Sequence, residues 1–120
     1  MKKFDLNERL IDFAVQLIFT TDSVKNTKAG NHLTSQLIRS GTSPALNYSE
    51  AQSAESKNDF IHKMAIVLKE LRESLTSLKI IHRANLFASD ESQILKVINE
   101  NNELVSIFVK SIETTKKNKL

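Results

Sequence analysis

The chain has 120 residues, of which 40% are hydrophobic and 26% are charged, and its formal net charge is +3. This length is sufficient for a hydrophobic core but short for two, so we predict a single domain over residues 1–120. The absence of cysteine excludes disulfides, a thiolate nucleophile and a cysteine zinc site, and it favours a cytoplasmic protein. Because only two glycines and one proline are available to break helices, we predict an all-α chain. Glu8, Arg9 and Asp12 interrupt the apolar residues near the start of the sequence, so we predict neither a signal peptide nor a membrane span.

Residues 5–22 form the first predicted helix, because apolar residues recur there at helical spacing. The face that we expect to enter the core carries Leu6, Leu10, Phe13, Ala14 and Leu17. A second apolar set, rotated well away from the first, consists of Ile11, Val15, Ile18 and Phe19. Residues 23–30 are polar and lack periodicity, so we predict a connection there and a second helix that begins near Asn31.

The second predicted helix contains Pro44 at the end of residues 40–44, a run that is poor in helix formers. Pro44 could bend one continuous helix, or it could begin a new helix with Ser43 as the N-cap. The sequence pattern leaves both alternatives open.

One side of this second helix carries a polar stripe at spacings of four, four and three residues: Arg39, Ser43, Asn47 and Glu50. Arg39 cannot act as an ordinary base, Ser43 has no aligned histidine, and Glu50 has no acid partner. We therefore interpret the stripe as a hydrogen-bonding or ion-pairing surface, within one subunit or between subunits. We predict no enzymatic activity.

The third predicted helix begins at Ser56, which with Asp59 three residues later resembles a capping box. Its apolar seam consists of Phe60, Met64, Val67, Leu68, Leu71, Leu75 and Leu78. A fourth helix follows a cap at residues 89–91, and its seam consists of Ile94, Ile98, Val105, Phe108 and Ile112. We expect a basic tail at residues 116–120 to fray. Short connections hold consecutive helices antiparallel, so we predict an up-down-up-down four-helix bundle.

The fourth helix also carries apolar residues in excess of one seam. They lie about 80° to 100° from that seam and are Val97, Leu104 and Ile107. Self-association would bury these residues together with the second apolar set of the first helix, so we predict a homo-oligomer held through these surfaces. The alternative is that broad apolar stripes reflect wide core-facing surfaces.

The segment from Arg39 to Ala51, followed by Asp59 and Phe60 and a leucine-rich helix, resembles the ribosomal RNA intervening-sequence protein family. This resemblance covers most of the chain. It implies a four-helix bundle whose second helix is bent near Pro44, assembled as a homo-oligomeric ring of five subunits, and it implies no catalytic chemistry. A more distant similarity to the accessory protein of diversity-generating retroelements implies contact with nucleic acid.

Basic residues are concentrated in two places. One sector of the third helix carries Lys69, Arg72, Lys79 and Arg83. The second group, near the two ends of the chain, comprises Lys2, Lys3, Lys110, Lys116, Lys117 and Lys119. We predict that these residues bind the backbone of RNA or DNA without sequence specificity, since one tyrosine and no tryptophan provide no evident base-stacking platform. For any single one of these residues the alternative is a solvated lysine face or tail. The alternative function of the protein is a protein–protein adaptor with no nucleic-acid role.

The three histidines, His32, His62 and His82, do not have the spacing of a helical metal site. We expect His82 to pack at the end of the third helix and His62 to lie on its outer face. The sequence therefore predicts neither a metal nor another cofactor.

Overall fold

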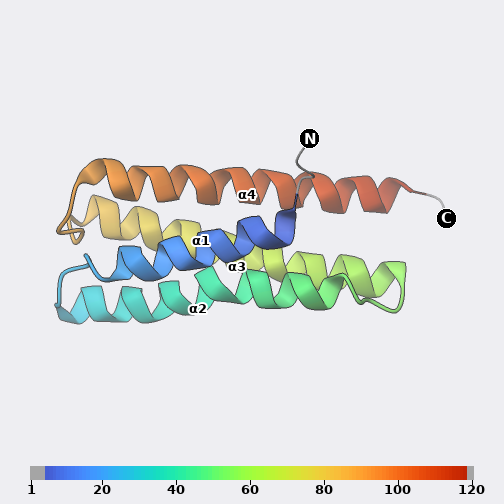
Figure 1. Cartoon of the computed structure of the whole chain (residues 1–120), viewed down its shortest axis with the longest axis horizontal. Helices are drawn as coiled ribbons and strands as arrows, with labels where there is room; N and C mark the ends of the chain where they lie inside the picture. The colour runs from blue at the N-terminus through green and yellow to red at the C-terminus, as the bar shows by residue number, and fades with distance from the viewer. Residues whose placement is uncertain (1–4, 119–120) are drawn as a thin grey trace.

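Four α-helices make up the computed structural model, which describes residues 5–118 (Figure 1). They are α1 (Leu6–Thr21), α2 (Lys28–Ala51), α3 (Lys57–Arg83) and α4 (Glu91–Lys117). In Figure 1 each helix runs back alongside the one before it, so α1 and α3 share one direction and α2 and α4 the other. The prediction of an all-α four-helix bundle is confirmed. Because α4 continues to Lys117, two of the residues that we expected in a loose tail are helical.

A side-chain oxygen caps the start of each helix and thereby fixes its first residue. Thr27 Oγ1 accepts a hydrogen bond from the Gly30 N–H at 3.0 Å, and α2 therefore begins at Lys28, earlier than the expected start near Asn31. The caps of the other three helices are Asp5, Ser56 and Asp90. The predicted caps of the third and fourth helices are thus confirmed.

The helix α2 continues through Pro44 without interruption, which excludes the alternative of two separate helices. The bend near Pro44 stays a prediction. One turn earlier, Gly41 allows α1 and α2 to approach closely, since a Cβ atom added there would lie 1.9 Å from Leu17 Cδ1.

One face of each helix contributes to the core. The core residues of α1 are Leu10, Phe13 and Leu17, and the apolar core residues of α3 are Met64, Val67, Leu71, Leu78 and Ile81. All of these residues except Ile81 belong to the faces that the sequence predicts for the two helices. A T-shaped contact between the rings of Tyr48 and Phe108, whose centroids are 5.6 Å apart, connects α2 with α4.

Two polar side chains are buried within this core, where α3 meets α4. Asn101 Oδ1 accepts a hydrogen bond from Ser74 Oγ at 2.8 Å, and Asn101 Nδ2 donates one to the Leu71 carbonyl at 2.9 Å. Both side chains are fully buried, and each has hydrogen-bond partners. The core face of α4 therefore runs through a polar residue and consists of Ile94, Val97, Asn101, Leu104, Phe108 and Ile112.

The α1–α2 and α3–α4 connections lie at the same end of the bundle (Figure 1). An isolated antiparallel bridge joins them: the Lys25 N–H donates to the Leu86 carbonyl at 2.8 Å, and the Ala88 N–H donates to the Ser23 carbonyl at 2.7 Å. Asn85, with φ of 58°, takes the left-handed conformation that often ends a helix. This end of the bundle is thus closed by backbone hydrogen bonds.

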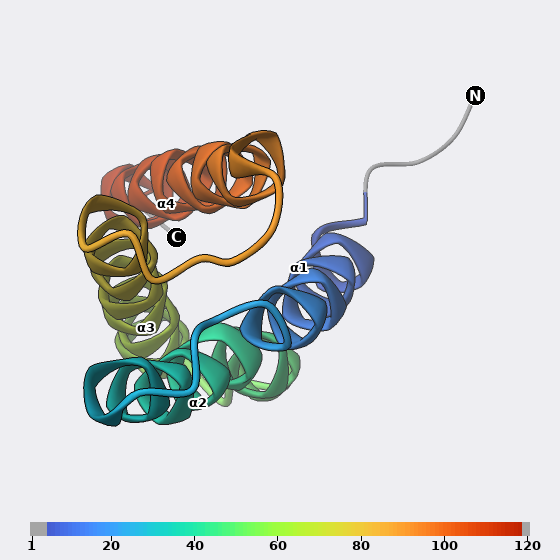
Figure 2. The ribbon, with the colours of Figure 1, turned by 90° about the vertical axis from the view of Figure 1, so that its left-hand side faces the viewer.

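Seen from that end, α1 and α3 lie on opposite sides of the bundle, with α2 and α4 on the two remaining sides (Figure 2). An ion pair links α1 to α4, where Arg9 Nη2 lies 2.8 Å from Glu100 Oε1 and 3.2 Å from Glu103 Oε1. Among residues 5–118, no helix is both long enough and apolar enough to cross a bilayer.

Candidate functional site

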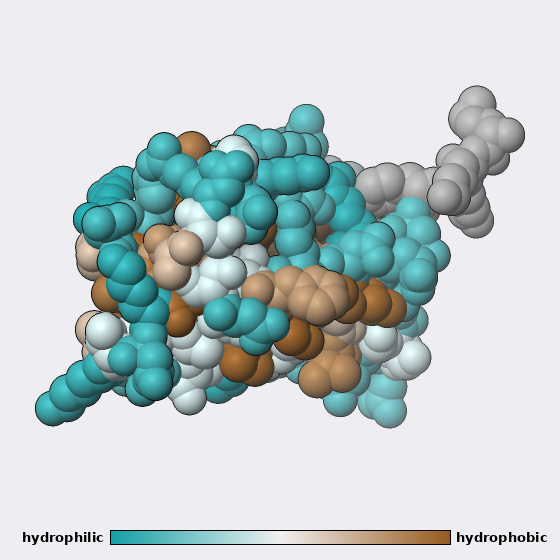
Figure 3. All heavy atoms as spheres, turned by 60° about the vertical axis from the view of Figure 1, so that its left-hand side comes forward, coloured by the Kyte–Doolittle hydropathy of each residue, from teal (hydrophilic) through white to brown (hydrophobic). Residues whose placement is uncertain are grey.

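The side of α1 that faces away from the core carries four exposed large apolar side chains. These residues, which we call the α1 outer face, are Ile11, Val15, Ile18 and Phe19. Val15 is 45% exposed and Phe19 is 68% exposed. Figure 3 shows hydrophobic side chains gathered across the surface that α1 helps to form, with hydrophilic side chains around them. An exposed apolar set opposite a buried one is typical of a helix that packs against a second partner. The role of the α1 outer face as an interface stays a prediction.

The interface predicted on α4 is wrong for two of its three residues. Val97 is 2% exposed and Leu104 is fully buried in the core of the single chain, whereas Ile107 is half-buried. The cause is Asn101, which lies between Val97 and Leu104 on the core face of α4. The seam was predicted from apolar residues alone, and a polar residue is not expected in a core. The prediction therefore left out Asn101 and placed the seam to one side of the true core face of α4.

The polar stripe of α2 contributes to a network between α2 and α3 of the same subunit. Arg39 Nη2 donates to Glu73 Oε2 at 2.6 Å, and Arg39 Nη1 donates to Glu70 Oε2 at 3.2 Å. Asn47 Nδ2 donates to Glu70 Oε1 at 3.4 Å. Among the described residues, the remaining two members of the stripe do not join this network: Ser43, which is half-buried, and Glu50, which is exposed.

The two carboxylates of this network were not predicted as site residues. Their spacing of three residues along α3 is the signal that could have suggested a shared basic partner. Burial raises the pKa of the Glu70 carboxyl above its ordinary value, and the charge of Arg39 opposes that rise. Arg39 and Asn47 of the stripe therefore connect α2 to α3, and the charge of Arg39 is paired with Glu70 and Glu73.

The predicted basic sector of α3 lies at the surface. Its four residues are exposed, and within residues 5–118 none of them takes part in an ion pair: Lys69, Arg72, Lys79 and Arg83. Their charges are therefore available to an anionic partner.

The predicted basic group at the chain ends is described only in part. Exposed positions on α4 are occupied by Lys110, Lys116 and Lys117, while Lys2, Lys3 and Lys119 lie outside the described residues. Near this end Lys57 Nζ donates a hydrogen bond to the Asn118 carbonyl, which brings the start of α3 beside the end of α4.

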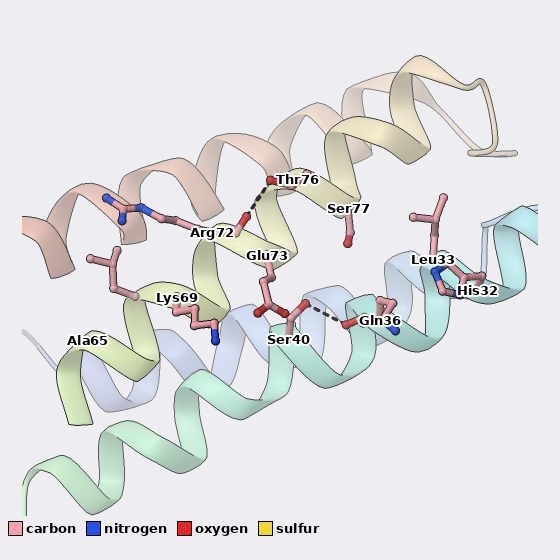
Figure 4. Close-up of a pocket in the computed structure, with 11 residues that line it drawn as sticks. His32, Leu33, Gln36, Ser40, Ala65, Lys69, Arg72, Glu73, Thr76 and Ser77 are labelled. Atoms are coloured by element: carbon pink, nitrogen blue, oxygen red, sulfur yellow. Dashed lines mark hydrogen bonds between the residues drawn. The ribbon is translucent and has the colours of Figure 1, made fainter. Parts of the chain in front are cut away.

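A hollow of about 710 Å³ lies between α2 and α3 (Figure 4). Lys69 and Glu73 extend from α3 toward α2, whereas Arg72 extends away from it (Figure 4). Two hydroxyl groups in the hollow donate to backbone carbonyls of their own helices: Ser40 Oγ to Gln36 at 2.9 Å and Thr76 Oγ1 to Arg72 at 3.0 Å. The hollow therefore offers charged and hydrogen-bonding groups, and two of its hydroxyl groups are engaged with backbone carbonyls.

The three histidines lie apart from one another. His32 lines the hollow, His62 is exposed, and His82 Nε2 lies 2.8 Å from Glu91 Oε2, where α3 ends and α4 begins. Among the described residues, no group of three His, Cys, Asp or Glu side chains could hold a metal ion.

Similarity to known proteins agrees with this architecture. The sequence profile of the 23S rRNA-intervening sequence proteins matches residues 2–110. The chain belongs to this family. A crystal structure of a protein of unknown function from the S23 ribosomal protein family of Bacteroides thetaiotaomicron is 28% identical to this chain, with a TM-score of 0.79. That similarity covers 90% of this chain and 98% of the other.

No curated protein matches the chain. The family resemblance carried by the segment from Arg39 to Ala51 is confirmed, and the related structure is of a protein with unknown function. The matches indicate neither a catalytic family nor a catalytic fold.

Proposed function

We propose that this member of the 23S rRNA-intervening sequence protein family is a non-enzymatic scaffold that assembles from several copies of itself. The observation that carries this proposal is that α1 has two apolar faces. Leu10, Phe13 and Leu17 enter the core, while the α1 outer face meets solvent. Burying apolar surface contributes about 25 cal/mol per Å², so association through this face stabilises an oligomer. A ring of five copies is the assembly that the family resemblance implies, and symmetry allows it.

The test compares two apolar-to-charged substitutions by light scattering. Val15→Glu places a carboxylate on the α1 outer face and should lower the molar mass to that of one chain, because an unpaired charge is costly in an apolar interface. Leu95→Glu is the matched control, since Leu95 is exposed to a similar extent on α4. It should leave the mass unchanged. Equal effects of the two substitutions would contradict a role for the α1 outer face.

A second candidate function is binding to the phosphate backbone of nucleic acid. The four exposed cations of α3 support it, because they are free of ion pairs among residues 5–118. Each phosphate that such a residue neutralises releases counterions, so binding should weaken steeply as salt rises. Fluorescence anisotropy with a labelled single-stranded RNA over a salt series tests this function. Absence of binding to RNA or duplex DNA at low salt would favour the protein-adaptor alternative.

A further inference from the structure

The α1 outer face is acidic as well as apolar. Its exposed carboxylates are Glu8, Asp12 and Asp22. At 100° per residue, they lie within about 120° of helix circumference together with the four apolar residues. The one basic residue of α1, Arg9, points instead toward α4, where its Nε and Nη2 atoms each lie 2.8 Å from an oxygen of Glu100. The outward side of α1 thus presents carboxylates and apolar side chains together.

The outward side of α3 has the opposite charge. Besides its four cations it carries two large exposed apolar residues, Ile66 and Ile80. By the same helical geometry these six residues share a sector of about 140°, which we call the α3 outer face. Glu73 also falls within this sector, but its carboxylate, like the Lys69 side chain, extends toward α2 (Figure 4). There Arg39 pairs with the carboxylate at 2.6 Å. This face presents cations and apolar side chains together.

The two faces cannot meet within one chain, because α1 and α3 lie on opposite sides of the bundle (Figure 2). We propose that the α1 outer face of one copy docks against the α3 outer face of the next. This inference rests on the proposed self-association and names the two surfaces that form it. Contacts between two different patches repeat from copy to copy and close into a ring when the rotation allows. Since α1 and α3 run in the same direction, successive copies can stay parallel (Figure 1).

A second copy fits the α3 outer face better than a nucleic-acid backbone does. Phosphates would pair with Lys69, Arg72, Lys79 and Arg83, but they offer no apolar surface to Ile66 and Ile80. The α1 outer face offers both carboxylates and apolar side chains. Complementary charge also selects this docking over contact between two α1 faces, where like charges would meet.

Charge reversal on each face tests the pairing. Asp12→Lys/Asp22→Lys reverses α1, and Arg72→Glu/Lys79→Glu reverses α3; all four residues are exposed and outside the ion pairs of residues 5–118. Each double variant alone should associate at least tenfold more weakly than the unmodified protein in sedimentation velocity. The two variants mixed in equal amounts should associate again, and so should the chain that carries all four changes. Far-UV circular dichroism checks that every variant is folded.

The control variant Lys110→Glu/Lys117→Glu changes the charge equally on α4 and should associate normally. If the unmodified protein self-associates but neither the mixture nor the fourfold variant recovers association, the docking of α1 on α3 is wrong while self-association stands. If Arg72→Glu/Lys79→Glu abolishes RNA binding and leaves association intact, the α3 outer face is a nucleic-acid surface and the inference is overturned. If the unmodified protein stays a single chain, the proposed function itself fails.

Discussion

Asn101 shows how one polar side chain can determine the orientation of a helix. Its amide is fully buried and bonds to Ser74 Oγ and to the Leu71 carbonyl. In a core, a polar group is tolerated only where its partners are in place, so these bonds favour one alignment of α4 against α3. A pattern of apolar residues cannot reveal such a position, because the sequence does not state where the partners lie.

Replacing Asn101 by Ala should lower the free energy of unfolding by about 2 to 4 kcal/mol, since it removes two buried hydrogen bonds and leaves a cavity. Urea denaturation followed by circular dichroism measures the change. Asn102→Ala is the control, because Asn102 is the next residue and is exposed. Equal shifts in the two midpoints would show that the amide of Asn101 contributes nothing specific.

Glu70 provides a test of pH dependence. Burial raises its pKa above the ordinary carboxyl value, so the folded state holds this proton more tightly than the unfolded state does. Across the window between those two pKa values, stability falls as pH rises. Glu70→Gln removes this titration, and its stability relative to the unmodified protein should therefore improve from pH 4 toward pH 7. A difference between the two proteins that is independent of pH would contradict this account.

At the scale of helices, the sequence predicts those features that depend on residues within a few turns, such as helix caps and apolar seams. The cap at Ser56 and the α3 seam from Met64 to Leu78 are confirmed, because capping oxygens and apolar spacing act within a few turns. The core face of α4 was misjudged, since it depends on a hydrogen bond to another helix. The partners of Arg39 in its ion pairs could not be predicted from local patterns either, because Glu70 and Glu73 lie about thirty residues further along the chain.

The orientation of α4 leads to a prediction about the element as a whole. Leu104→Ala should cost about 2 to 5 kcal/mol of unfolding free energy, as a large-to-small change in a core does. Leu95→Ala on the exposed side of the same helix should cost less than about 0.5 kcal/mol. If Leu104→Ala weakened association and left stability unchanged, Leu104 would belong to an interface between copies, as the sequence pattern first predicted.

At the scale of the whole molecule, two opposite sides of the bundle differ in charge. The α1 outer face is apolar and acidic, and the α3 outer face on the opposite side is basic. The apolar excess of α1 is readable from helical spacing alone. Its relation to α3 requires the fold, since only the arrangement of the helices places the two faces on opposite sides of one bundle.

We propose that this chain associates with itself through the α1 outer face. The most direct measurement is the molar mass of the unmodified protein by sedimentation equilibrium over a range of micromolar concentrations. We expect a mass that is a multiple of 13.6 kDa, with five copies as the proposed assembly. A mass of 13.6 kDa at every concentration would contradict the claim and leave the exposed apolar residues of α1 without a partner in this protein.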